Sequence, residues 1–280
     1  MKKRNFLYLL NPLNVVSDCI READLIWQLT LRSIRAEVKG SVLGLLWNVL
    51  NPLLMLAVYV VVFGMIFGAR FDESPHPGTV DYVLGLFLGL ALYRLIADVL
   101  VMAPRLILNQ PNYVNKVVFP LEVLPISLVY VGVYRFLITL VLFFVGTLLF
   151  GDGISWHVLL FPISAFPVVL IALGVAYFIS ALGVFIRDLA QITSVLSIVL
   201  LYASGVFYAA TKVQALAPYV WLWLKWNPML LAIDASRKVL LWGMSPSPTE
   251  MLYTWCVGIV VCSLGYATFT KLRPAFADVL

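Results

Sequence analysis

The residues with the most evident chemistry form a basic cluster near the N-terminus, made of Arg32, Arg35 and Lys39. Guanidinium and ammonium groups make strong charge-assisted hydrogen bonds with phosphate oxygens. The cluster ends the segment 16–39, in which apolar residues recur at helical spacings: Ile20, Trp27, Leu31, Ile34 and Val38. This pattern predicts an amphipathic helix in the cytoplasmic interface, with its apolar side in lipid and its basic half near anionic headgroups or phosphate.

Four ionisable residues interrupt long apolar runs: Arg94, Asp98, Glu122 and Arg135. Arg94 and Asp98 are four residues apart and could pair on one helix face. That favours a structural pair, or a snorkelling end group, over a proton relay, which needs several ionisable residues at mid-membrane depth. Glu122 lies between prolines near the start of an apolar run, where structural and gating roles are both open.

Aromatic residues follow the first apolar run at intervals of four, as Tyr59, Phe63 and Phe67. Such a stripe usually faces lipid or packs in a core. The functional alternative is a conduit wall, because sugar rings stack on aromatic faces and phenol hydroxyls offer hydrogen bonds.

Motifs for other chemistry are absent from the sequence. There is no G-x-x-x-x-G-K-[ST], H-E-x-x-H or G-x-S-x-G pattern. The histidines are His76 and His157, and the cysteines Cys19, Cys256 and Cys262 lack metal-ligand spacing. We therefore expect no metal, no cofactor and no catalytic residue in this chain, which argues against an enzyme.

Composition identifies the class of protein that must position these residues. Of 280 residues, 62% are hydrophobic and 12% are charged, whereas soluble domains carry roughly 25% charged residues. An all-α polytopic membrane protein fits this balance. The sequence predicts a single transmembrane domain over 1–280, with six spans at 44–68, 82–103, 117–150, 158–186, 190–210 and 251–270.

The distribution of Lys and Arg predicts the orientation. The N-terminus, MKKRNFLYLLNPLN, has an apolar core too short for a signal peptide, so 1–43 is expected to stay in the cytoplasm. With the N-terminus inside, inner segments hold twelve Lys and Arg residues and outer segments five. This bias favours both termini inside, including a tail at 271–280. No internal repeat is evident, which disfavours an inverted-repeat transporter.

The segment 211–250 is hydrophobic but is cut by Asn227-Pro228 into halves too short to span. Trp221, Trp223 and Trp226 suit an interfacial position, because the indole ring is apolar and its N–H needs a polar partner. The sequence predicts two short helices in a re-entrant or interfacial hairpin, with an ordinary outer loop as the alternative.

Four stretches resemble the permease subunits of polysaccharide-exporting ABC transporters, in the type-2 ABC membrane family. The first is K-G-S-x-L-G-x-L-W-x-x-x-x-P-L from Lys39 to Leu53. The second is NYVNKVVFPLEVLP at 112–125, and the third is F-x-R-D from Phe185 to Asp188. The fourth is WNPM at 226–229 followed by Arg237. Together the four are more specific than any one alone, and they cover most of the chain in order.

The resemblance implies an exporter of lipid-linked polysaccharide, of O-antigen type, in the bacterial inner membrane. Two copies of the chain would form a channel and dock onto two ATP-binding cassette subunits, which would use ATP and Mg²⁺. The fold would combine six spans, an N-terminal interface helix and short outer gate helices at 211–250. The loop 104–116 would be a cytoplasmic coupling loop.

The resemblance also suggests roles for particular residues. Arg32, Arg35 and Lys39 would meet the carrier's pyrophosphate, and Tyr59, Phe63 and Phe67 would line the channel. The residues expected at the ATPase contact are Arg21, Glu22, Asn109, Gln110, Asn112, Asn115 and Lys116. Those expected at the outer gate are Trp223, Trp226, Asn227, Pro228 and Arg237.

Rival interpretations remain at this stage. One is a permease of the same family for teichoic acid, capsule, a lipid or a drug. Another is an ion-coupled secondary transporter, which would need no ATPase partner. A third is a membrane enzyme acting on polyprenyl phosphate, for which Asp18, Glu22 and Asp24 form the only local acidic cluster, at a spacing that suits a solvated helix face better.

Overall fold

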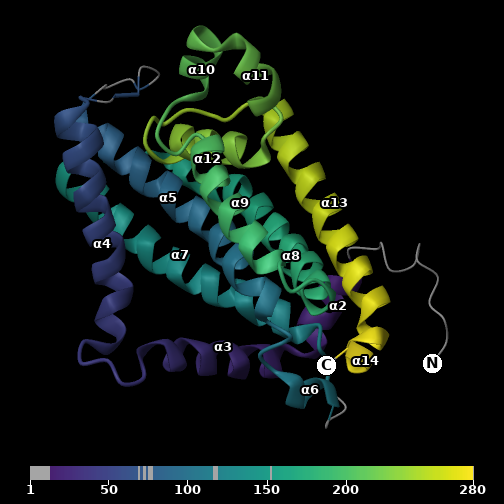
Figure 1. The fold of residues 1–280 in the computed structure, drawn as a ribbon. Coiled ribbons are helices and arrows are strands. Elements are labelled where there is room, and N and C mark those ends of the chain that lie inside the picture. The colour runs from purple at the N-terminus through teal and green to yellow at the C-terminus, as the bar shows by residue number, and fades with distance from the viewer. Residues whose placement is uncertain are drawn as a thin grey trace.

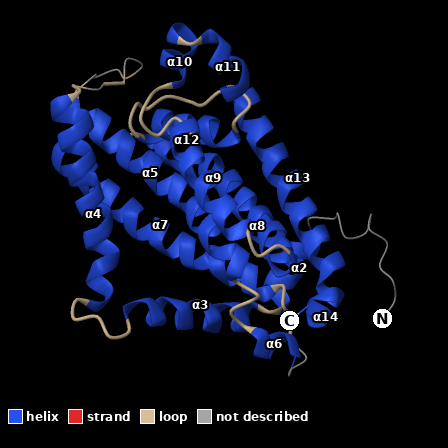
Figure 2. Cartoon of the chain, in the orientation of Figure 1, coloured by secondary structure: helices blue, strands red, loops and turns tan. Residues whose placement is uncertain are grey.

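The computed structural model describes residues 13–68, 70–71, 74, 78–115, 119–151 and 153–279, and every regular element among them is helical (Figure 2). The order of the longer elements is α2 (Leu13–Arg21), α3 (Ala23–Val38), α4 (Trp47–Tyr59), α5 (Thr79–Met102), α7 (Val123–Phe150), α8 (Phe161–Phe185), α9 (Leu189–Ala203), α12 (Pro228–Leu240) and α13 (Pro248–Leu272). Shorter helices are α6 (Pro111–Asn115), α10 (Ala210–Leu216), α11 (Pro218–Leu224) and α14 (Phe276–Val279). Short 3-10 turns are η1 (Gly44–Leu46), η3 (Ala103–Arg105), η4 (Trp156–Leu160) and η5 (Arg273–Ala275), and η2 (Val60–Ile66) is π-helical.

Five helical stretches are long and apolar enough to cross a membrane: Gly44–Ile66, Thr79–Arg105, Val123–Phe150, Trp156–Phe185 and Pro248–Val279. The apolar run at 190–210 forms the shorter helix α9 of 15 residues. At 1.5 Å per residue α9 is about 22 Å long, less than the roughly 30 Å hydrocarbon core. It ends at Ala203 because Gly205, at φ 69°, turns the chain away.

Helices α5 and α8 lie in the middle of the bundle, and α13 packs along α8 at one side of it (Figure 1). Glycines bring α8 and α13 into backbone contact: a Cβ on Gly174 would lie 2.3 Å from the Val261 carbonyl oxygen, and one on Gly265 would lie 2.1 Å from the Gly174 oxygen. Small residues allow this approach, which replaces the hydrophobic driving force that lipid does not supply. The first span differs, since Pro52 is the one buried residue of α4.

Helix α3 and the short helices α10 and α11 lie at opposite ends of the bundle (Figure 1). Helix α3 lies across one end of the long helices, and α10 and α11 lie at the other (Figure 1). The spans between them therefore connect two surfaces with different helices on each.

The single helix predicted over 16–39 is wrong. The chain forms α2 and α3, with a break at Glu22, whose backbone has φ −106° and ψ 20°. The residues that α3 buries are Ile26, Thr30 and Ile34, whereas Ile20 and Trp27 of the predicted stripe are 74% and 59% exposed. The predicted stripe is expected to face lipid, so the exposure of Ile20 and Trp27 does not contradict it, whereas Ile34 of the same stripe is buried against the bundle.

Candidate functional site

A polar cavity of about 280 Å³ lies where α3, α4, α5 and α7 meet. Its charged lining residues are Glu37, Arg94, Asp98 and Arg135, and α4 adds the amides of Asn48 and Asn51. Charged groups inside a membrane bundle are costly and mark functional positions. The cavity is therefore the first candidate site.

Arg135 of α7 connects three helices across this cavity. Its Nη1 donates to Asp98 Oδ2 of α5 at 2.5 Å, and its Nη2 donates to Glu37 Oε1 of α3. The pairing suggested between Arg94 and Asp98 is absent, because Asp98 turns to Arg135 on the neighbouring helix. Sequence reasoning missed the Glu37 contact, since its partner lies 98 residues away.

A second polar surface is formed by α3 and the segment that follows α5. One groove of about 550 Å³ joins Arg32 of α3 to Asn109, Gln110 and Asn112, and Arg32 Nη1 donates to the Tyr113 hydroxyl at 2.9 Å. An adjacent groove of about 600 Å³ includes Arg32, Arg35 and Lys39. The structure thus brings the basic cluster and the polar loop residues to one surface, with Arg32 in both grooves.

Arg21 and Glu22 lie at the break between α2 and α3. Arg21 pairs with Glu22 at 2.9 Å and with Asp18 at 3.0 Å. The hydrogen bond to Glu22, followed by the charge of Asp18, raises the pKa of Arg21 above its usual value. Of the other residues expected here, Lys116 and the side chain of Asn115 lie outside the described residues.

The aromatic stripe of the first span meets a partner from the α9 end. The ring of Phe207 lies 5.6 Å from that of Tyr59 and 4.8 Å from that of Phe63. Phe63 also contacts Phe67, which is 70% exposed, and Tyr202 contacts Phe207. These five residues form an aromatic cluster between the first span and α9, partly open to the surroundings. Tyr202 and Phe207 were missed, because the sequence does not show that the turn after α9 lies beside the first span.

Arg237 of α12 is buried at 1% exposure, and its guanidinium is surrounded by backbone oxygens. It donates to the carbonyls of Gly85 at 3.0 Å, Gly205 at 2.8 Å and Val206 at 2.6 Å, and the Phe71 ring lies 4.3 Å away. These bonds tie α12 to α5 and to the turn after α9. Among the expected gate residues, Arg237 is thus a buried clamp, which means that it holds α12, α5 and the turn after α9 together.

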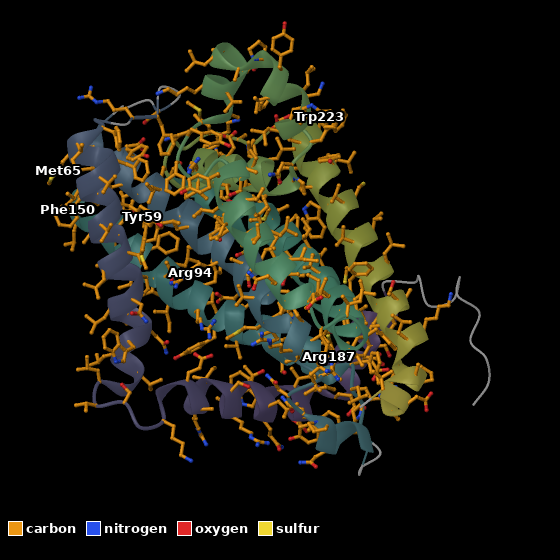
Figure 3. The ribbon with its side chains drawn as sticks, in the orientation of Figure 1. Tyr59, Met65, Arg94, Phe150, Arg187 and Trp223 are labelled. Atoms are coloured by element: carbon orange, nitrogen blue, oxygen red, sulfur yellow. The ribbon has the colours of Figure 1, made fainter. Side chains whose placement is uncertain are left out.

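Asn227 and Pro228 begin α12 in a way that local sequence explains. Asn227 Oδ1 accepts from the Met229 amide at 3.0 Å, and Pro228 occupies the first helical position. Asn227 Nδ2 also donates to the Ala203 carbonyl at 2.9 Å, so the cap contacts the end of α9. Trp223 is 81% exposed at the end of the molecule that carries α11 (Figure 3), and Trp226 is 60% exposed.

Comparison with known proteins adds independent information. A family model described as ABC-2 type transporter matches residues 24–241. The chain is 26% identical over 266 residues to the O-antigen export system permease protein RfbA of Myxococcus xanthus, covering 95% of this chain and 99% of that protein. It is 27% identical over 260 residues to a protein of the same name from Klebsiella pneumoniae, covering 92% of this chain and 95% of that protein.

Proposed function

Because the chain belongs to the ABC-2 type transporter membrane family, we propose that it is the channel-forming subunit of an ATP-driven exporter of lipid-linked, O-antigen-like polysaccharide. The observation that carries this proposal is its similarity, over 92–95% of its length, to permeases named for O-antigen export. The aromatic cluster supports a carbohydrate substrate, since exposed rings stack on sugars without binding one sugar tightly.

In this proposal the subunit has six spans, with α9 as the short fifth span, and lies in the bacterial inner membrane with both termini in the cytoplasm. The Lys and Arg bias supports this orientation. It places α3 at the cytoplasmic interface and α10, α11 and α12 at the outer face. There Trp223 and Trp226 would lie at headgroup depth in a re-entrant gate.

A second copy of the chain would complete the channel. The first span and α9 expose apolar side chains, including Met65 at 73%, Ile192 at 59% and Tyr202 at 60%. A homodimer that joined these surfaces would place Tyr59, Phe63 and Phe67 along a shared conduit.

ATP and Mg²⁺ would be bound by two separate ATP-binding cassette subunits, and this chain would supply their docking surface. The groove between Arg32, Asn109, Gln110 and Asn112 is polar and lies at the α3 end of the molecule. Hydrogen-bonding side chains in such a groove give a directional joint. Closure of the ATPases would then move α3, and through Glu37 and Arg135 it would move α5 and α7.

The carrier's pyrophosphate would approach the groove that contains Arg32, Arg35 and Lys39. Their side chains are exposed, so they can reach an anionic group at the membrane surface without breaking core packing. Guanidinium groups bind phosphate oxygens in a bidentate manner, which suits this task.

The proposal is tested by purifying the chain from its native membrane and by deleting it in the source organism. We expect a soluble ATPase subunit to co-purify, and the deletion strain to retain completed lipid-linked polysaccharide on the cytoplasmic side. Purification without an ATPase, or normal surface polysaccharide in the deletion strain, would refute it.

A further inference from the structure

Two polar groups in the cavity between α3, α4, α5 and α7 have no ligand role in the function proposed above. Among the residues that the structure describes, no carboxylate lies within 4 Å of the Arg94 guanidinium. Asn48 Nδ2 is buried and has no hydrogen-bond partner in the same described set. A buried donor without a partner carries a desolvation penalty, so an acceptor that entered the cavity would relieve it.

The charges around the cavity favour an anion at one position. The charged groups that face it are Glu37, Arg94, Asp98 and Arg135. Both carboxylates bind Arg135, which leaves Arg94 as the cation available to a ligand. The Asn51 amide lines the same cavity and can donate beside it.

A second, apolar cavity of about 130 Å³ continues from the first along α4. The two cavities share Pro52, Ala91, Arg94 and Thr139. The second is otherwise lined mostly by apolar and aromatic side chains, including Met55, Tyr59 and Leu90. Arg94 lies closer to α3 than Tyr59 does (Figure 3), so polarity falls with distance from α3.

We propose that the two cavities hold the headgroup and part of one acyl chain of a glycerophospholipid from the membrane leaflet on the α3 side. Its phosphate pairs with Arg94 and accepts from the amides of Asn48 and Asn51, and an acyl chain enters the apolar cavity toward Tyr59. The polar cavity, at about 280 Å³, is just below the roughly 300–1,000 Å³ usual for ligand pockets, so it suits a single headgroup and not a polymer. The bound lipid supports α4, which buries little of its own surface against the bundle.

This inference does not rest on the proposed function, because a lipid site can serve a permease of any substrate. The two are separated by measuring lipid binding on the purified chain without any transport assay. The probe is palmitoyl-oleoyl phosphatidylglycerol, titrated into delipidated protein and followed by native mass spectrometry.

We expect one phosphatidylglycerol to bind each subunit, and Arg94→Gln to weaken this binding roughly tenfold or more, the scale of one charge-assisted hydrogen bond. Arg187→Gln is the matched control, because Arg187 is exposed at the turn between α8 and α9 and lines neither cavity (Figure 3). The Arg187→Gln variant should bind phosphatidylglycerol with the same affinity as the wild type. Equal binding by wild type and Arg94→Gln would overturn the proposal.

Asn48→Leu separates a ligand role from a structural one. It removes an unpartnered buried amide, so the lipid-free variant should melt at the same temperature as the wild type or above it. It should nevertheless bind phosphatidylglycerol several-fold more weakly. Unchanged lipid affinity in this variant contradicts the site.

Two further arms identify the source of the phosphate. Inorganic phosphate at millimolar concentration should leave the bound phospholipid in place, because it cannot fill the apolar cavity. Displacement by inorganic phosphate would overturn the lipid assignment in favour of an ion site. Recovery of a lipid-linked glycan from the untreated protein, lost in Arg94→Gln, would overturn it in favour of the exported substrate.

Discussion

Two arginines, Arg135 near the α3 end and Arg237 at the opposite end, bind in different ways. Arg237 is 1% exposed and donates to backbone carbonyls of other segments. The side chain of Arg135 is 27% exposed, binds carboxylates on two helices and borders a cavity. Backbone carbonyls keep their positions while the fold persists, whereas carboxylates can exchange partners. The α12 end is therefore held by partners that are fixed in the fold, whereas the α3 end is held by partners that can exchange.

Among the variants that test this comparison, Arg237→Met should cause the largest loss of stability. The variant leaves several buried carbonyls without a donor, each worth about 1–3 kcal/mol, so unfolding free energy should fall by at least about 3 kcal/mol. Chemical denaturation in detergent measures it. Lys212→Met is the control, because Lys212 is exposed on α10 at the same end of the molecule. A loss below about 1 kcal/mol would contradict the clamp.

A smaller loss of stability is expected when the ion pairs of Arg135 with Asp98 and Glu37 are removed. A double-mutant cycle with Arg135→Met and Glu37→Gln should give a coupling energy of about 1 kcal/mol, as for partly exposed interacting pairs. Both variants should also speed amide hydrogen exchange in α3, because the pair fastens α3 to α7. Exchange that stays slow in α3 while α7 loosens would show that Arg135 only stabilises its own helix.

Much of the fold could be predicted from local signals. Long apolar runs predict the helices, and Asn227-Pro228 predicts the break before α12 because the cap and the proline act locally. The break at Glu22 and the buried face of Ile26, Thr30 and Ile34 could not be predicted, since contacts with the bundle decide them.

The candidate sites follow the same division. Arg32, Asn109 and Asn112 could be named from residue type, but their shared groove depends on how α3 lies against the loop that follows α5. The Glu37–Arg135 pair and the carbonyl partners of Arg237 join residues far apart in the chain. No spacing rule connects such residues before the helices are packed.

The cap at Asn227 should contribute less to the free energy of unfolding than Arg237, which lies at the same end of the molecule. Asn227→Ala removes the bond to the Met229 amide and the bond to the Ala203 carbonyl, so we expect a loss of about 1–2 kcal/mol. Asn227→Asp keeps the cap acceptor but lacks the donor, and should recover about half of the loss. If Asp and Ala variants are equally unstable, the contact with α9 carries the effect alone.

The combined variant Arg32→Gln, Arg35→Gln and Lys39→Gln should have the smallest effect on stability. Its effect on export should nevertheless be clear. The three side chains are exposed, so unfolding free energy should change by less than about 0.5 kcal/mol. Export should fall if these cations meet the carrier's pyrophosphate.

Tyr113→Phe removes only the bond from Arg32 to α6, and it separates loss of that contact from loss of charge. Export reduced by the triple variant but not by Tyr113→Phe supports a phosphate role. Equal reduction by both would place the function of Arg32 in the joint between α3 and α6, and unchanged export in the triple variant would remove the basic cluster from the mechanism.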